Sequence, residues 1–346
     1  MKHLKKCLII AFVFTLTLSA QSIEISRVSP KAEVIQYIGL SRIDINYSRP
    51  GVKGRVIWGK LVPYNKGIPF PWRAGANENT TIELSDDAKI NGKEIKAGVY
   101  GFHIIPSNDI WTLIFNKQNK SWGSFFYDES YDALRIEVEP TECDFTEWLE
   151  YGFKDLTQYS ATIYMKWEKL EINFTVTFNE KEVVLNNIRQ QLLSLPGFGW
   201  EGPMEAAAFC LENDFNYNEA LKWINLSISR NPNFQNKIIK VGLLEKIGTK
   251  EEAEKIKKDA FDNSTETELN VYGYEILNNN KIDEALEIFK LNVTRHPKSW
   301  NCHDSYAEAL LKANKEEEAI INYKKALELA PENQKERISN SIKQIK

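Results

Sequence analysis

Hydrophobic and polar residues alternate along several short segments in the first half of the chain. In the segment RIDINYS, the apolar side chains of Ile43, Ile45 and Tyr47 fall on one face. The same alternation runs through 161–167 and 170–178. A period of two is the mark of a strand that buries one face. The pattern therefore predicts β-strands in these places.

Further strands are expected around these segments. Five have the composition and length of strands: Ala32–Ile38, Thr80–Leu84, Val99–Ile105, Ile110–Asn116 and Leu134–Glu139. The dipeptide Asn91-Gly92 and the stretch Ser107–Asp109 supply turn residues between them. Many short strands without helical spacers are typical of an antiparallel β-sandwich or an open barrel. We expect that fold over residues 21–179.

The hydrophobic period changes after Asn179. The segment EKEVVLNNIRQQLLSL places apolar residues at helical spacing, and Pro196-Gly197 then interrupts it. We expect a linker helix within residues 180–200.

From about Glu201 onward the chain repeats itself. The segments YNEALKWINLSISRNP, KIDEALEIFKLNVTRHP and EEEAIINYKKALELAP superimpose directly. Ala285 and Ala319 are 34 residues apart, as are Pro297 and Pro331. A period of about 34 residues is the signature of tetratricopeptide helix pairs.

Residues 201–333 resemble the tetratricopeptide repeat family. Gly273 and Ala307 stand where that family packs one helix on another, and Phe289 and Tyr323 fill its large apolar position. The resemblance implies an α-solenoid of about four helix pairs, with residues 334–346 as a capping helix. Two features depart from the family. Asn292 replaces a small residue, and the second repeat lacks the terminal proline.

The first twenty residues have the organisation of a secretory signal peptide. Lys2, Lys5 and Lys6 precede an apolar run, and the small residue Ala20 follows it. The run is shorter than the roughly 20 residues that a membrane span requires. We expect cleavage after Ala20 and export to the periplasm or beyond in a Gram-negative bacterium. On this interpretation, the mature protein is not an integral membrane protein.

Charge and cysteine content narrow the remaining possibilities. The chain of 346 residues has a formal net charge of -4, which gives no electrostatic reason to expect a nucleic acid partner. Cys143, Cys210 and Cys302 are widely separated and show no metal or redox spacing. We expect buried free thiols.

A polar and aromatic cluster in the strand region is the best candidate for a ligand site. It comprises Arg49, Lys53, Arg55, Trp72, Arg73, Asn77 and Glu78. Arginine among aromatic rings can hold a carboxylate or phosphate while the rings stack on a sugar or an apolar group. The alternative is that these side chains bind one another and fix loops at one end of the sandwich.

Four segments of this region together resemble a bacterial family, the domain of unknown function 2911. They are IGLSRIDINYSRPGVKGRVIWGKLVPY, PWRAGANENTTIEL, INGKEIKAGVYGFHIIP and IWTLIFNKQ. The resemblance covers about residues 23–178 and implies a β-rich extracytoplasmic module of the kind common in exported proteins of Bacteroidetes, sometimes joined to tetratricopeptide repeats. It implies no established activity. Ala74 stands where the family usually has threonine, which argues against an essential hydroxyl group there.

Catalytic motifs are missing from the sequence. There is no G-x-S-x-G, phosphate-binding loop or dinucleotide-binding fingerprint, and no cluster with the spacing of metal ligands. We therefore expect no cofactor and no metal. His103 is the one histidine of the strand region, and we interpret it as structural. A carboxylate pair drawn from residues such as Glu78, Glu142 and Asp144 keeps a hydrolase-like enzyme open as an alternative.

The repeats favour a binding function. A short tetratricopeptide stack exposes a groove that typically takes a peptide or a segment of a partner protein. Asn270, Asn301 and Lys312 are the polar candidates for that groove. The sequence thus predicts an exported, non-enzymatic binding or scaffold protein. The alternative is a hydrolase-like enzyme, or a carbohydrate-binding or small-ligand-binding module, that uses the polar cluster of the β-domain.

Overall fold

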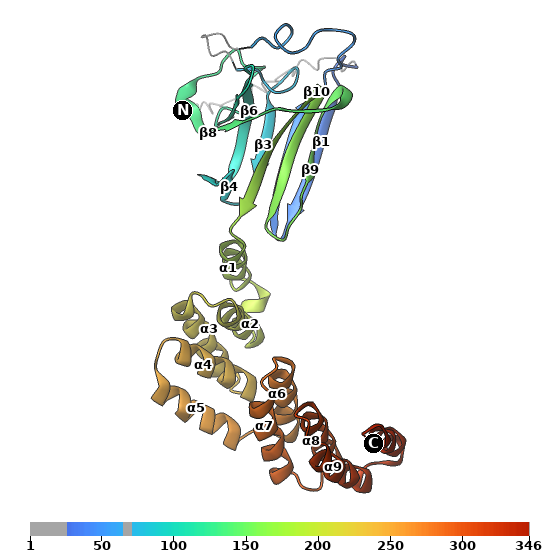
Figure 1. Cartoon of the computed structure of the whole chain (residues 1–346). Coiled ribbons are helices and arrows are strands. Elements are labelled where there is room, and N and C mark those ends of the chain that lie inside the picture. Colours follow the sequence, from blue (N-terminus) through green and yellow to red (C-terminus); the bar gives the residue numbers. More distant parts are fainter. Residues whose placement is uncertain (1–25, 65–70, 346) are drawn as a thin grey trace, which may run out of the picture. The chain divides into compact units, whose positions relative to one another are not determined.

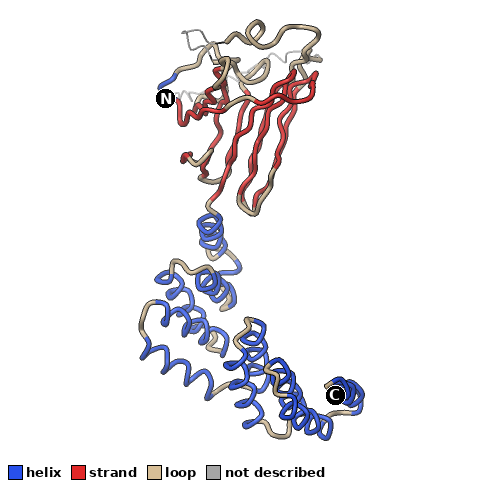
Figure 2. The backbone as a smooth tube through the Cα atoms, in the orientation of Figure 1, coloured by secondary structure: helices blue, strands red, loops and turns tan. Residues whose placement is uncertain are grey.

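The computed structural model describes residues 26–64 and 71–345. The predicted signal peptide, residues 1–20, lies outside the described residues. The chain divides into two compact units between Val184 and Leu185, and this division falls within the segment predicted as a linker helix. Strands make up the first unit and helices the second (Figures 1 and 2). The predicted fold class is confirmed.

The larger sheet of the first unit is antiparallel and has six strands among the described residues, in the order β1-β2-β3-β6-β7-β8. The strands are β1 (Lys31–Ile38), β2 (Ser41–Ser48), β3 (Thr80–Leu84), β6 (Gly98–Ile105), β7 (Trp111–Asn116) and β8 (Asp132–Val138). Each lies within two residues of a predicted strand. A single 3-10 turn, η1 (Glu129–Tyr131), precedes β8.

The smaller sheet has the order β5-β4-β10-β9 among the described residues. Its strands are β4 (Ala88–Ile90), β5 (Lys93–Ile95), β9 (Thr141–Lys154) and β10 (Ser160–Phe178). Phe102 of the larger sheet meets Phe174 of the smaller sheet, with ring centroids 5.5 Å apart. Both side chains are buried in one core that draws residues from both sheets. The unit is therefore a two-layer sandwich.

The predicted turn at Asn91-Gly92 joins β4 to β5, two short strands that were not predicted. Both residues have positive φ, 46° for Asn91 and 81° for Gly92, which is the conformation that a two-residue hairpin turn requires. This hairpin adds a short edge to the smaller sheet.

The two alternating segments 161–167 and 170–178 form one strand rather than two. In β10, the buried side chains have odd numbers up to Trp167 and even numbers from Ile172 onward. Glu168, between them, has a φ of 60°, and the pairing with β9 shifts there. This β-bulge moves the following residues to the other face, so the strand continues while its period changes phase. Strand β9 was not among the predicted strands, because its exposed, acidic first half shows no alternation.

The second unit is a stack of antiparallel helix pairs. Helix α1 (Glu180–Gln191) and the 3-10 turn η2 (Leu195–Gly197) precede the first pair. The pairs are α2 (Glu201–Glu212) with α3 (Tyr217–Arg230), α4 (Phe234–Lys246) with α5 (Lys250–Asp262), α6 (Glu266–Asn278) with α7 (Ile282–Arg295), and α8 (Trp300–Lys312) with α9 (Glu316–Leu329). Helix α10 (Glu332–Gln344) follows the last pair and packs on α9.

The small and large positions of the repeats meet as the family resemblance implies. A Cβ atom on Gly273 would lie 2.8 Å from two ring atoms of Phe289, so only glycine allows α6 to approach α7 this closely. Asn292, which replaces a small residue, is fully buried and donates from Nδ2 to the carbonyl of Glu266 at 3.0 Å. The polar replacement thus ties α7 to the start of α6.

The second repeat, which lacks the terminal proline, connects to the third in a different way. Thr265 caps α6 through a reciprocal capping box with Glu268. Phe234, Phe261 and Tyr272 pack edge to face between α4, α5 and α6, with centroids 5.5 to 5.9 Å apart. Aromatic packing joins these two repeats.

None of the described helices is long and apolar enough to span a membrane.

Candidate functional site

The loop that enters β3 has a constrained backbone. Ala74 and Asn77 have positive φ values of 49° and 61°, a region that costs free energy for residues other than glycine. The carbonyl of Ala74 accepts hydrogen bonds from Thr80 Oγ1 at 3.0 Å and from the hydroxyl of Tyr151 at 2.7 Å. Surrounding side chains therefore hold this loop in one conformation.

Of the first three basic candidates, Arg49 and Lys53 contact β9, whereas Arg55 bonds within its own loop. Arg49 donates from Nε to the carbonyl of Leu149 at 2.8 Å and faces Glu150 at 3.4 Å. Lys53 places its ammonium 5.4 Å from the ring centroid of Trp148. Arg55 donates to the backbone carbonyls of Val52 and Gly51 within its own loop. These contacts join the segment after β2 to the smaller sheet.

Trp72 belongs to the core of the sandwich. It is half-buried and stacks on Trp167 with centroids 5.7 Å apart. Trp58 packs edge to face on both rings at 5.8 Å. The Nε1 atom of Trp72 donates to the carbonyl of Gly75 at 3.1 Å. The Trp72 ring therefore connects the loop that enters β3 to the core of the sandwich.

Arg73, Asn77 and Glu78 also have partners. Glu78 pairs with Arg27 at 2.6 Å, and this bond lowers the pKa of its carboxyl group. Asn77 donates from Nδ2 to the carbonyl of Ser29 at 3.2 Å. Arg73 donates to the carbonyl of Asn77 and pairs with no carboxylate among the described residues. Ligand binding by the predicted cluster stays a prediction.

A buried polar network next to this loop includes His103. Its Nδ1 atom lies 2.9 Å from Ser124 Oγ and its Nε2 atom 3.3 Å from Asn79 Nδ2. Asn79 Nδ2 also donates to the carbonyl of Gly123 at 3.1 Å. That bond fixes the Asn79 amide as a donor, so Nε2 of His103 accepts and Nδ1 carries the proton.

This tautomer has a chemical consequence for the serine. With its proton on Nδ1, His103 donates to Ser124 instead of accepting the hydroxyl proton, which is opposite to the role of a general base. Burial lowers the pKa of His103 to about 4, so the ring is neutral near pH 7. The interpretation of His103 as structural accords with this geometry.

The segment that carries Ser124 runs between β7 and β8 and is fixed at both ends. Asn116 donates from Nδ2 to the carbonyl of Asp128 at 2.9 Å and to the Asp132 carboxylate at 2.7 Å. Asp132 also accepts from Arg135 and from the Tyr127 hydroxyl at 2.6 and 2.8 Å. This segment was not predicted as a site, although its run SWGSFFY is the most aromatic in the chain.

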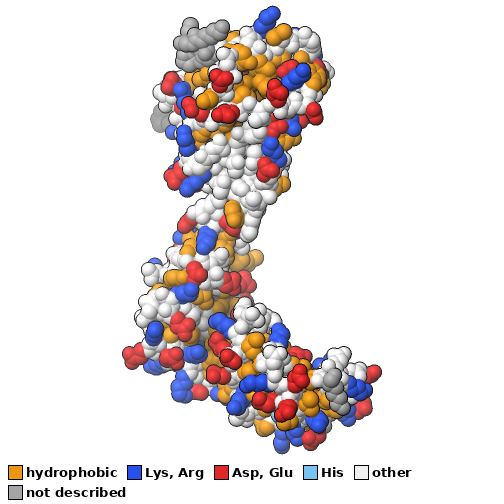
Figure 3. Space-filling view, in the orientation of Figure 1, with side chains coloured by type: hydrophobic (Ala, Val, Ile, Leu, Met, Phe, Trp, Pro, Cys, Tyr) orange, Lys and Arg blue, Asp and Glu red, His pale blue; other side chains and the backbone are white. Residues whose placement is uncertain are grey.

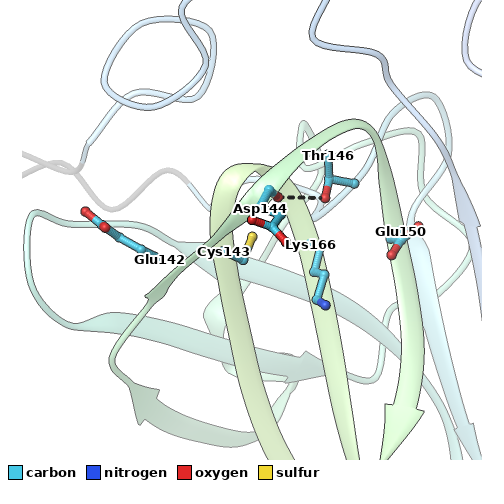
Figure 4. Close-up of a pocket in the computed structure, with 6 residues that line it drawn as sticks. All are labelled: Glu142, Cys143, Asp144, Thr146, Glu150 and Lys166. Carbon is cyan, nitrogen blue, oxygen red and sulfur yellow. Dashed lines mark hydrogen bonds between the residues drawn. The ribbon is translucent and has the colours of Figure 1, made fainter.

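A cavity of ≈ 600 Å³ lies over the bulged part of β9 and β10. Glu142, Cys143, Asp144, Thr146, Glu150 and Lys166 line it. Figure 4 shows that Glu142 points away from the other five side chains. Among the described residues, no group of three or more His, Cys, Asp or Glu side chains could hold a metal ion. The carboxylates here do not converge on one point.

The cysteine of this cavity differs from the expectation of buried thiols. Cys210 and Cys302 are buried, whereas Cys143 is only half-buried. It lies in the acidic, partly exposed half of β9, which explains why the expectation was wrong for this residue. Burial raises the pKa of all three thiols, so the neutral thiol is favoured in each.

The three groove candidates lie on the first helices of the third and fourth repeats. Asn270 is on α6, and Asn301 and Lys312 are on α8. Their side chains make no hydrogen bond or ion pair with other described residues. Asn270 is half-buried, and its Oδ1 atom is shielded from solvent without a partner. By contrast, the side chains of Arg49, Arg55 and Glu78 in the β unit all bond to other protein groups.

Asp304, which was not among the predicted site residues, lies 34 residues after Asn270 at the equivalent position of α8. Its Oδ2 atom pairs with Arg337 of α10 at 2.6 Å, while its Oδ1 atom is buried without a partner. Burial raises the pKa of this carboxyl group even though Arg337 opposes the shift. The repeat period itself could have identified this residue as the counterpart of Asn270.

Solved structures match part of this chain at low identity. MamA MSR-1 C2 is 17% identical with a TM-score of 0.25, over 43% of this chain and 86% of that one. YrrB, described as a TPR protein with an unusual peptide-binding site, is 17% identical with a TM-score of 0.27, over 47% and 84%. The human IFIT1 dimer with PPP-AAAA is 16% identical with a TM-score of 0.25, over 48% and 41%. These values are too low to support an argument about function.

The β unit has a match at the level of family. Curated proteins give no match to the chain. The predicted resemblance of the strand region is nevertheless confirmed: residues 29–176 match the family described as Protein of unknown function (DUF2911).

Proposed function

We propose that the protein is an exported binding or scaffold protein whose repeat unit holds an extended segment of a partner protein along α6 and α8. The β-sandwich is the second module of this scaffold. One observation carries the proposal: the polar side chains of Asn270, Asn301 and Lys312 have no partner among the described residues. A helical repeat with unpaired polar groups on its first helices has donors and acceptors available for a peptide backbone.

The chemistry of these helices defines the kind of segment that fits. Asn270 and Asp304 each keep a side-chain oxygen without a donor. Leaving a buried acceptor unpaired is unfavourable, and a bound donor removes that cost. Both oxygen atoms are shielded from solvent, so the backbone N–H groups, or the Lys and Arg side chains, of an extended partner segment reach them only after these two side chains turn outward. We therefore expect a peptide that donates hydrogen bonds to α6 and α8.

The test is a selection of peptides from a random phage-displayed library on the full mature chain. Peptides that bind through α6 and α8 lose at least about tenfold in affinity for the Asn270→Ala variant, the effect of about one good hydrogen bond. The matched control is Asn225→Ala, an exposed asparagine on α3. Failure to select any peptide, or equal affinity for both variants and the unaltered chain, contradicts the proposal.

Export is supported by the basic start and short apolar run of residues 1–20. Expression in a Gram-negative host followed by N-terminal sequencing tests it. The expected mature protein begins at Gln21 and is recovered from the periplasm or the medium. A cytoplasmic protein that retains Met1 contradicts export and leaves the peptide-binding proposal untouched.

A further inference from the structure

The segment between β7 and β8 presents large aromatic side chains to solvent. Trp122, Phe125 and Phe126 are 51%, 67% and 70% exposed. Figure 3 shows hydrophobic side chains gathered at the loop-bearing upper end of the β unit. Three exposed aromatic side chains within five consecutive residues mark a candidate binding surface, whereas single exposed apolar residues are ordinary. We call these three residues the aromatic platform.

The platform is held in place from below. Between Trp122 and Phe125, the carbonyl of Gly123 accepts from Asn79, and the hydroxyl of Ser124 bonds to His103. Gly123 and Ser124 are both buried. The backbone amide of Asn79 donates to the carbonyl of Ser121 at 3.1 Å. Because the backbone is already ordered, a ligand that contacts the rings does not have to order it first.

Arg73 completes the surface with a positive charge. Its guanidinium lies 5.6 Å from the ring centroid of Phe125 and packs so tightly on Gly123 that any side chain there would overlap it. Its one hydrogen bond within the described residues goes to the carbonyl of Asn77. No carboxylate within ion-pair distance neutralises it among those residues, although the side chain is half-buried. A partly buried guanidinium without a counter-charge favours an anionic ligand.

We propose that Arg73 and the aromatic platform form a binding site for an acidic sugar residue, such as a hexuronate within a polysaccharide. The planar guanidinium fork matches a carboxylate, and the exposed rings offer flat surfaces for the C–H faces of pyranose rings. This proposal concerns the β unit alone and does not depend on peptide binding by the repeats.

The surroundings favour a sugar over a lipid bilayer or a large protein. In the sequence, Lys117 and Lys120 precede the platform residues and Asp128 and Glu129 follow them, so this segment is not the polybasic kind that attracts anionic bilayers. The surface that three side chains on one segment can bury is far smaller than the roughly 800 Å² that each partner buries in a stable protein interface. A surface of this size matches one or two sugar rings.

Isothermal titration of the full mature chain with a galacturonate hexamer and a hyaluronan hexamer tests the proposal. At least one of these acidic probes should bind, and neutral cellohexaose should bind at least about tenfold more weakly, which is the effect of losing one charge-assisted contact. Arg73→Gln and Trp122→Ala should each weaken binding of the acidic probe by about tenfold or more. Arg42→Gln and Phe145→Ala, an arginine and an exposed aromatic residue elsewhere on the β unit, are the matched controls and should bind normally.

Gly123→Ala provides a second, independent variant. It leaves every proposed contact group in the chain but displaces the Arg73 guanidinium, the flexible end of a side chain, so it should weaken binding as Arg73→Gln does while the melting transition persists. The proposal is overturned if neither acidic probe binds, or if binding is the same in Arg73→Gln. It is also overturned if phosphatidylglycerol vesicles bind through the three aromatic residues while the sugars do not.

Discussion

The polar residues of the β-unit loops and those of the repeat helices look alike in the sequence and differ in the structure. Arg49, Arg55 and Glu78 all bond to neighbouring protein groups. Asn270 and Asn301 bond to none of the described residues. The first set stabilises its own fold, whereas we propose that the second binds a partner. Substitutions in the two sets should therefore affect different measurements: unfolding for the loops and binding for the repeats.

The largest expected change in the unfolding free energy of the β unit comes from the protonation of His103 as the pH falls. Its pKa is about 4 in the folded protein, below the ordinary value of 6.5, because burial disfavours the charged ring. A lowered pKa gives stability that is present above pH 6.5 and is lost as the pH falls toward 4. The full difference corresponds to about 3 kcal/mol.

The measurement is the difference in unfolding free energy between the unaltered chain and His103→Gln, by urea titration at a series of pH values. The difference should shrink by up to about 3 kcal/mol between pH 6.5 and pH 4, since glutamine does not titrate. A difference that stays constant with pH means that His103 is not a buried neutral ring.

The next effect concerns the packing of the helix pairs. Gly273→Ala places a Cβ atom 2.8 Å from the Phe289 ring and should destabilise the repeat unit by about 1–3 kcal/mol through overpacking. Phe289→Leu in the same chain should recover part of that loss, because the smaller side chain makes room. Strictly additive effects of the two substitutions in a double-mutant cycle contradict this packing.

A smaller loss is expected for the arginine that joins the β-unit loop to β9. Arg49→Gln removes the bond from Nε to the Leu149 carbonyl and should lower the unfolding free energy of the β unit by about 1 kcal/mol. Hydrogen exchange should show faster opening near the isolated bridge of Gly51 and Trp148. Unchanged exchange there means that Arg49 does not hold the loop.

The smallest effect on stability should come from Asn270→Ala. The substitution removes an oxygen that has no partner, so the unfolding free energy should change by less than about 0.5 kcal/mol. A large loss of stability indicates that Asn270 is structural and removes the contrast with the β-unit loops.

Regular patterns made most of the fold predictable. The period of two located β2 and both halves of β10, composition and length indicated the other five strands of the larger sheet, and the 34-residue period located the helix pairs. The three-residue strands β4 and β5 were not predicted. The sequence did not predict the continuous strand β10, because the bulge at Glu168 shifts the buried face by one residue. Strand β9 was missed because its first half is exposed and lacks alternation.

The polar sites were less predictable, since they depend on contacts between distant segments. The network of His103, Asn79 and Ser124 joins residues up to 45 positions apart, and no local pattern links them. Trp72 was predicted at a ligand site as an aromatic residue next to arginine, but its ring stacks on Trp167, nearly 100 residues away. Whether a polar side chain is satisfied is a property of the tertiary structure.

The most direct test of the proposed function compares peptide affinity with stability in one variant. A library-selected peptide is titrated into the unaltered chain, Asn270→Ala and the control Asn225→Ala, and the melting temperature of each protein is recorded. The account predicts an affinity at least about tenfold lower for Asn270→Ala at an unchanged melting temperature, with normal affinity for the control. Equal affinity of all three proteins for the peptide would contradict it.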